Sequence, residues 1–241
     1  MYGITFNGKH SLRDFGLYAE NKTINAPSKK KITDSVPFMH GVYDFSTVGS
    51  NGEQVFDLRT VTVTLRIIAY SVEELHTVYR QALEWLMDDG EHELVFDFMP
   101  DFYFMAEVQD APDWDKFLRY GLLSVDFICR PFKYSTSYMG DDIWDTFNFL
   151  TDYTQYTNTF KIDTLQVINI CNNGRLITPV INVDIPMKLS IENSLKTYTL
   201  NVGDNKIWDL KLKNGTNFLM FEVITARVIG TAKIIFRWES L

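Results

Sequence analysis

The chain has 241 residues, of which 46% are hydrophobic and 22% charged, and its formal net charge is −8. This composition excludes intrinsic disorder, and the length suits one large domain or two modest ones. The acidic balance argues against nucleic-acid binding over the whole surface, which would require a basic stripe. Aromatic residues make up 15% of the chain, and together with many Val, Ile and Thr they favour strands over helices.

The N-terminal sequence MYGITFNGKHSLRDFGLY lacks the basic, apolar and small-residue regions of a secretory signal. No apolar run is long enough for a transmembrane helix. We therefore expect folding in a cytoplasm and no membrane insertion. Cys129 and Cys171 are the only cysteines, and in a cytosolic chain without a C-x-x-C motif two reduced thiols are favoured over a disulfide.

The first predicted elements are short strands over residues 4–6 and 15–18, joined by a hairpin at the turn-forming pair Asn7-Gly8. Residues 21–41 then become polar and lose any period. Compact domains rarely keep such a long excursion without a use. The breaks within it are Pro27, Pro37 and Gly41.

A long strand with one buried face is predicted over residues 55–71, where apolar and polar side chains alternate. A helix over residues 71–90 follows directly. Ser71 and Glu74 form an S-x-x-E capping box at its start, and apolar residues then recur every three or four positions. An isolated helix of this length is marginal in water, so its apolar stripe should pack on a sheet.

Two more strands are predicted over residues 92–110, broken at Met99-Pro100-Asp101, and another strand ends before Pro131. This element order indicates an α+β domain in which one helix packs on a mostly antiparallel sheet or split barrel. We assign residues 1–135 to this domain. The polar, turn-like residues 136–151 are assigned to a linker.

Residues 152–241 contain strand-like runs separated by turn signals at a spacing of roughly 8 to 12 residues. This pattern predicts a β-sandwich or jelly roll, so the whole chain is expected to be mainly β with one helix. Trp144, Trp208 and Trp238 are candidates for stacking on sugar rings. Burial in the sandwich core is the alternative, because strands commonly bury such rings.

No group of residues indicates catalysis. His92 lies between Glu91 and Glu93, but strand neighbours point to opposite faces, so we interpret the segment as a polar turn and not as a metal site. Asp113 and Asp115 are interpreted as a Pro-Asp turn. The chain has no G-x-S-x-G, H-E-x-x-H, phosphate loop or C-x-x-C. We predict no catalytic, cofactor-binding or metal-binding residues, no cofactor and no enzyme activity.

Several segments of the first 135 residues occur together in one known family. Its start reads F-x-F-N-G-x-x-S-x-x-F-G-L, which this chain matches in part through Phe6, Asn7, Gly8, Ser11, Phe15, Gly16 and Leu17. The other segments are VPFMHGVYDF, RTVTVTLRI, SVEELHTVYRQALEWL, ELVFDFMPDFYFMAEV and VDFICRPFKYS. Together they resemble the distal tail proteins of long-tailed, non-contractile-tail phages or prophages of Gram-positive bacteria.

A weaker likeness continues through INICNNGRLITPVINVDI and LKNGTNFLMFEV, which resemble parts of the family's galectin-like C-terminal domain. The resemblance implies a structural virion protein, assembled in the host cytoplasm, that forms a hexameric ring between tail tube and tail tip. Its implied partners are copies of itself, the tail tube protein, a tail-associated lysin and a receptor-binding protein, with no specific nucleic-acid binding. A carbohydrate-binding adhesin acting through the sandwich is the alternative.

The basic tract in residues 28–45 has three interpretations. A nucleic-acid contact is disfavoured, because the lysines lack interleaved arginines and a basic surround. A solvated loop remains open. The resemblance favours an arm that reaches over the adjacent subunit, with its lysines facing acidic residues there and its aromatic residues anchoring its base. The residues assigned to this arm are Lys29, Lys30, Lys31, Phe38, Tyr43 and Phe45.

Overall fold

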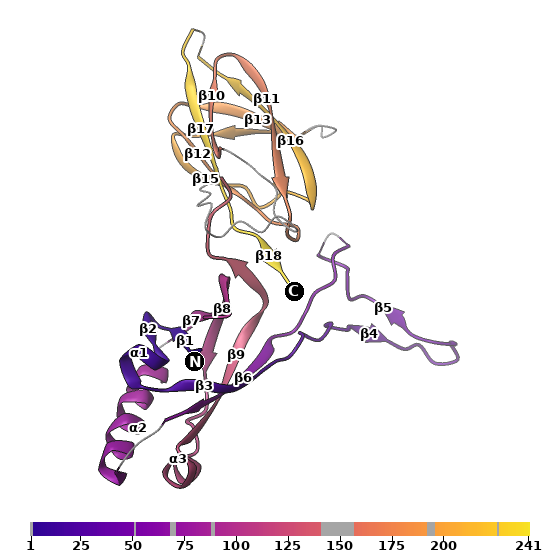
Figure 1. Cartoon of the computed structure of the whole chain (residues 1–241). Helices are drawn as coiled ribbons and strands as arrows, with labels where there is room; N and C mark the ends of the chain where they lie inside the picture. The colour runs from indigo at the N-terminus through magenta and orange to yellow at the C-terminus, as the bar shows by residue number, and fades with distance from the viewer. Residues whose placement is uncertain are drawn as a thin grey trace. The chain divides into compact units, whose positions relative to one another are not determined.

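The computed structural model describes residues 2–50, 52–67, 71–87, 90–140, 157–191, 196–225 and 227–241. The chain divides into two compact units, Met1–Lys133 together with Leu241, and Tyr134–Ser240 (Figure 1). Antiparallel strands build both units. The predicted mainly β fold is therefore confirmed.

An antiparallel sheet with the order β2-β1-β7-β8-β9-β6-β3 forms the first unit. Its edge strand β3 pairs with β6, and β6 pairs in turn with β9 over its full length. The strands are β1 (Ile4–Phe6), β2 (Lys9–His10), β3 (Tyr18–Ile24), β6 (Arg59–Arg66), β7 (His92–Phe96), β8 (Met99–Val108) and β9 (Leu122–Ser135).

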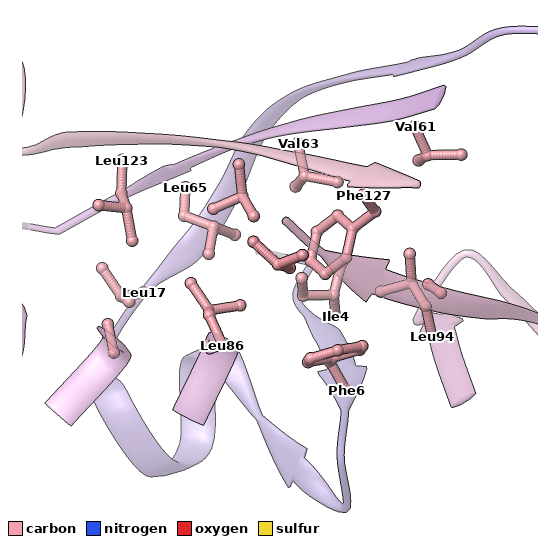
Figure 2. Close-up of a cluster of buried hydrophobic side chains, with 14 of the residues drawn as sticks. Ile4, Phe6, Leu17, Val61, Val63, Leu65, Leu86, Leu94, Leu123 and Phe127 are labelled. Carbon is pink, nitrogen blue, oxygen red and sulfur yellow. The ribbon is translucent and has the colours of Figure 1, made fainter. Parts of the chain in front are cut away.

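One face of this sheet is buried because apolar residues occupy alternate strand positions. Along β6, Val61, Val63 and Leu65 are each 0% exposed, and Figure 2 shows them gathered with Leu86 and Phe127. Burying each such side chain contributes roughly 1.5–3 kcal/mol. This core therefore gives the first unit its stability.

The predicted helix is α2 (Val72–Leu86), with Ser71 at its N-cap accepting a hydrogen bond from the Glu74 amide at 3.1 Å. Its buried Trp85 donates from Nε1 to the Phe6 carbonyl at 2.7 Å, which ties the helix to β1. The expectation of a single helix is wrong. The structure adds two short helices, α1 (Ser11–Phe15) and α3 (Trp114–Tyr120).

The first hairpin also differs from the prediction. Asn7 and Gly8 form the expected turn, both at positive φ, but β1 pairs there with the short β2, and α1 then occupies the start of the strand predicted over residues 15–18. His10 caps α1 through Nδ1, and Gly16, at φ 68°, ends it. Phe15 consequently belongs to α1, where its ring stacks on Trp85 with centroids 4.7 Å apart.

Two predicted strand ends lie elsewhere in the structure. The β7–β8 turn falls at Asp97-Phe98, so residues 99–101 belong to β8. β9 runs on past Pro131 to Ser135. Its pairing with β6 ends at Cys129, so the missing N–H of the proline interrupts no hydrogen bond of that ladder.

The second unit contains two four-stranded antiparallel sheets, ordered β10-β17-β12-β15 and β11-β16-β13-β14. Buried residues of both sheets form one apolar cluster, as expected for a sandwich. Residues 207–214 form no strand between β15 and β16, and Leu212 makes only an isolated bridge with Ile177. The strands are β10 (Thr159–Ile162), β11 (Leu165–Asn172), β12 (Val180–Val183), β13 (Met187–Ile191), β14 (Thr197–Leu200), β15 (Gly203–Lys206), β16 (Gly215–Val223) and β17 (Gly230–Ile235), and the short β18 (Glu239–Ser240) pairs with β9.

Two turns of the second unit are each held by the side chain of one asparagine, and both asparagines make the same set of hydrogen bonds, which we call an asparagine clamp. Asn205 accepts from the Asn201 amide and donates to the carbonyls of residues 201, 203 and 181. Asn217 repeats this set with residues 213, 215 and 170. In both turns a glycine at positive φ stands two residues before the asparagine. The pattern L-x-x-G-x-N therefore encodes a repeated strand entry.

Candidate functional site

The most unusual feature of the first unit is an arm formed by residues 25–58, which connect β3 to β6. Figure 1 shows it leaving the sheet beyond these strands as a long hairpin. Near its root the two sides are joined by hydrogen bonds from the Asp57 amide to Ser28 and from the Lys30 amide to Val55, both 2.9 Å long. Further out, β4 (Thr33–Asp34) pairs with β5 (Tyr43–Asp44).

Side chains brace the arm from within. The Asp44 carboxylate accepts from Lys31 Nζ at 2.5 Å and from the Ser46 amide at 2.9 Å. The Ser46 hydroxyl in turn accepts from the Ile32 amide at 2.9 Å. The hydrogen bond from Lys31, followed by those from Ser46, holds the pKa of Asp44 far below its usual range. The arm is thus a defined hairpin and not an unstructured loop.

A buried cation holds the root of the arm. Arg59 is only 6% exposed, its Nε donates to the Asn25 carbonyl at 3.0 Å, and its guanidinium lies 5.3 Å from the Phe104 ring centroid. Burial lowers the pKa of Arg59. Among the described residues no carboxylate forms an ion pair with it, so the contacts with Asn25 and Phe104 have to offset its desolvation.

The arm exposes an unusual number of large apolar side chains. Phe38 is 107% exposed and Val48 is 70% exposed. Exposed apolar surface gathered in one place marks a protein-binding site, whereas single exposed residues do not. The other large apolar residues that the arm exposes are Ile32, Val36, Val42, Tyr43, Phe45, Val55 and Leu58.

The predicted arm residues do lie on this hairpin, but two of the expected details differ. Lys31 pairs with Asp44 of its own arm, which removes it from the lysines available to a neighbour. Phe38 lies in the turn between β4 and β5, far from the base that it was expected to anchor. Tyr43 and Phe45 pack against each other with ring centroids 6.2 Å apart.

The sequence interpretation missed the aliphatic part of this surface. Val36, Val42 and Val48 lie among polar residues without a helical or strand period, so nothing local distinguishes them from buried residues. Val55 and Leu58 were expected within the strand over residues 55–71, but that strand begins only at Arg59. The available signal was their number within one aperiodic segment. Such a segment has no core of its own to bury them.

The candidate tryptophans divide into different environments. Trp208 is 71% exposed, and the Lys206 ammonium lies 4.6 Å from its ring centroid. Trp238 packs against the buried cluster of the second unit. Trp144 lies outside the described residues. Of the two candidates in the described part of the chain, Trp208 has the more exposed ring.

The other two polar groups lie in the first unit, at β7 and before α3. His92 belongs to β7 and its ring meets the edge of Phe6 at 5.6 Å. Asp113 lies directly before α3, and the side chain of Asp115 lies outside the described set. Among the described residues no three His, Cys, Asp or Glu side chains are grouped to hold a metal. No described helix is long and apolar enough to cross a membrane.

The family model of the phage tail protein RIFT-related domain matches residues 10–129 of the chain, a range that includes the whole arm. The chain belongs to this family of phage tail proteins and is thus a virion component, which confirms the resemblance inferred from its sequence. The search of curated proteins gave no match.

Among solved structures, the chain is similar to the crystal structure of SPP1 Dit, described as a paradigm of the hub adsorption apparatus in phages that infect Gram-positive bacteria. The TM-score is 0.67 with 13% identity, and the match covers 100% of both chains. The whole chain thus shares the fold of that protein. The phage P2 baseplate in its activated conformation with Ca is also matched, with a TM-score of 0.43, 8% identity and coverage of 97% of this chain and 98% of that chain.

Proposed function

We propose that this tail protein forms a ring, hexameric as the family resemblance implies, at the distal end of the phage tail. The ring joins the tail tube to the tail tip or baseplate and to the receptor-binding apparatus. Residues 1–135 build the ring, and residues 152–241 form a galectin-like sandwich. The function is structural and not catalytic, and the ring assembles in the host cytoplasm without specific binding of nucleic acid.

The arm is the observation that carries this proposal. A closed ring needs two different complementary surfaces on each subunit, since each copy contacts the next head to tail. A projecting hairpin is one such surface. Its nine exposed apolar side chains would each contribute roughly 1 kcal/mol if a neighbour covered the exposed part.

Electrostatics support a neighbour of the same kind. The arm as a whole (residues 25–58) carries three lysines and four acidic residues, but its lysines are adjacent at positions 29–31, in a chain with 31 acidic and 23 basic residues. Lys29 and Lys30 are exposed on the arm, and an acidic body of the next copy is a favourable surface for them. We also propose that part of the acidic surplus lines the ring's bore, where it would keep passing DNA from binding.

The proposal is tested with the full-length chain by mass photometry and negative-stain imaging, alone and with the purified tail tube protein. The double variant Lys29→Glu/Lys30→Glu should weaken assembly and leave the melting temperature of the monomer unchanged. Lys31 is left intact because its loss would also disturb the arm. Lys161→Glu/Lys213→Glu, at two exposed positions of the second unit, is the charge-matched control. A wild-type chain that forms no ring under either condition refutes the proposal.

A carbohydrate-binding adhesin is the second candidate, favoured by the exposed ring of Trp208. Tryptophan faces bind sugar rings when they are accessible, and this ring has a cation beside it instead of a core around it. Binding of the full-length chain on a glycan array, abolished by Trp208→Ala, would favour this function. Absence of glycan binding by the wild-type chain would refute the adhesin function.

A further inference from the structure

The tip of the arm is a β-turn that places an aromatic residue where glycine is usual. The Met39 amide donates to the Val36 carbonyl at 3.1 Å and closes the turn around Pro37 and Phe38. Phe38 has a φ of +68°. Proline followed by a residue at positive φ defines a type II turn, whose third position strongly prefers glycine.

This turn is strained at one residue. A bulky side chain at positive φ is a genuine outlier, and such strain persists chiefly where function maintains it. The same tip has Gly41 at φ +84°, so the chain does place glycine at positive φ nearby. At position 38 it instead holds a fully exposed phenylalanine in the strained conformation.

We infer that Phe38 is an aromatic anchor that inserts into an apolar cavity on a second copy of this chain. The inference rests on the proposed ring and specifies which residue holds one subunit to the next. Interfaces concentrate their binding energy in a few aromatic residues seated in pockets. Val36 and Val42, 52% and 55% exposed, flank the ring as the rim of such a contact.

The reach of the arm supports a partner beyond its own unit. Asn25 and Pro37 are 12 positions apart, which allows a span of at most about 40 Å. A folded unit of about 130 residues has a radius of gyration of about 14 Å. Such a length is sufficient to reach past the body, and Figure 1 shows β4 and β5 lying away from the sheet that carries the arm.

Charge and rigidity favour a second copy as that partner. The exposed Lys29 and Lys30 of the arm are complementary to the acidic surface that a chain with a net charge of −8 presents. The Lys31–Asp44 pair and the closed turn fix the hairpin before binding. Little conformational entropy is therefore lost when the Phe38 side chain binds the neighbouring copy. Each subunit of a closed ring would give one anchor and receive one.

The experiment compares two variants that keep the turn but lose the aromatic ring, Phe38→Gly and Phe38→Asn, since both residues accept positive φ. We expect the monomer to melt at the same temperature or higher, because the strain is relieved. The concentration for half-maximal assembly, measured by mass photometry, should rise roughly tenfold or more. Phe38→Leu should retain part of the assembly, and Tyr120→Ser, at a 63% exposed aromatic residue outside the arm, should retain all of it.

The outcomes separate this inference from the proposed function. If wild type and Phe38→Gly form hexameric rings equally well, the role of Phe38 as an anchor is refuted, but the proposed function of the protein as a ring is not. If wild type forms no ring, the proposed function itself fails. A lower melting temperature of the Phe38→Gly monomer would mean that the Phe38 side chain packs against its own chain. A defect seen only in binding to another tail protein would assign Phe38 to that protein. Either result overturns the inference.

Discussion

Replacing Asp97 by asparagine tests the network that joins β1, α1 and the β7–β8 turn. Asp97 accepts from the Gly3 amide at 2.7 Å and lies 3.0 Å from His10 Nε2. His10 Nδ1 accepts from the amides of Leu12 and Arg13. The proton of the neutral imidazole is therefore assigned to Nε2, where it is donated to Asp97.

The expected loss follows from the number of acceptor oxygens. Asparagine retains one oxygen, and where it occupies the place of Oδ2, which lies 2.7 Å from Gly3 N and 3.2 Å from His10 Nε2, the 3.0 Å contact of His10 with Oδ1 is lost together with the negative charge. A hydrogen bond to a charged group contributes about 1.5–3 kcal/mol, and water partly replaces it here because the Asp97 side chain is 30% exposed. We expect Asp97→Asn to lower the free energy of unfolding of the first unit by about 1–2 kcal/mol at pH 7.

The loss should depend on pH in one direction. Burial by itself would raise the pKa of Asp97, but the hydrogen bonds from Gly3 and His10 outweigh it, so the pKa is lowered. A lowered pKa in the folded state contributes stability that is present above the ordinary value of about 3.9 and disappears as the pH falls through the folded value. The difference between wild type and variant should therefore shrink below about pH 4.

Urea unfolding at pH 7 and near pH 3, followed by tryptophan fluorescence, to which the buried Trp85 of the first unit contributes, measures both quantities. Glu84→Gln, an exposed position on α2, removes one carboxylate outside the network and serves as the control. Unchanged stability at pH 7 would contradict the assigned hydrogen bonds. A loss of equal size at both pH values would contradict the charge argument.

Two further predictions concern the thiols and the asparagine clamps. Burial raises the pKa of Cys129 to about 12, whereas Cys171 is only partly buried. A disulfide reagent at pH 8 should therefore modify Cys171 in the folded chain and Cys129 only after denaturation. Rapid reaction of both thiols in the folded chain would contradict the burial of Cys129. Asn205→Ala and Asn217→Ala should each lower the free energy of unfolding of the second unit by about 1–3 kcal/mol, measured in urea, and an unchanged midpoint in both would show that the clamps are dispensable.

The sequence predicted elements whose signals are local. α2 has a serine cap and a full apolar stripe, and β6 alternates along its whole length, so neither depends on distant residues for its recognition. α1 escaped prediction because its cap is His10, a residue outside the usual capping set, and because five residues are too few to show a period. The local signals on offer were Gly16, which ends α1, and the S-x-x-D spacing of Ser11 and Asp14, whose carboxylate accepts from the His10 amide at 2.7 Å.

The sequence predicted where the arm lies in the chain but not that it forms a hairpin. Its hairpin depends on contacts between distant positions, such as Lys31 with Asp44 and Ser46 with Ile32, which no local pattern reveals. The exposure of Val36 or Phe38 is likewise a property of the fold, because the same residues in a strand of the sheet would be buried. The strain at Phe38 becomes visible only with its backbone angle.

The two kinds of residue on the arm should act on different steps of assembly. Charges at the edge of a contact mainly change the rate of association and its dependence on salt, whereas seated aromatic residues mainly change the rate of dissociation. Loss of Lys29 and Lys30 should therefore slow ring formation most at low ionic strength, where screening is weak. Loss of Phe38 should shorten the lifetime of the ring at every ionic strength. Lys29 and Lys30 would thus speed the association of the arm with the neighbouring copy, and the exposed side chain of Phe38 at its tip would slow its dissociation.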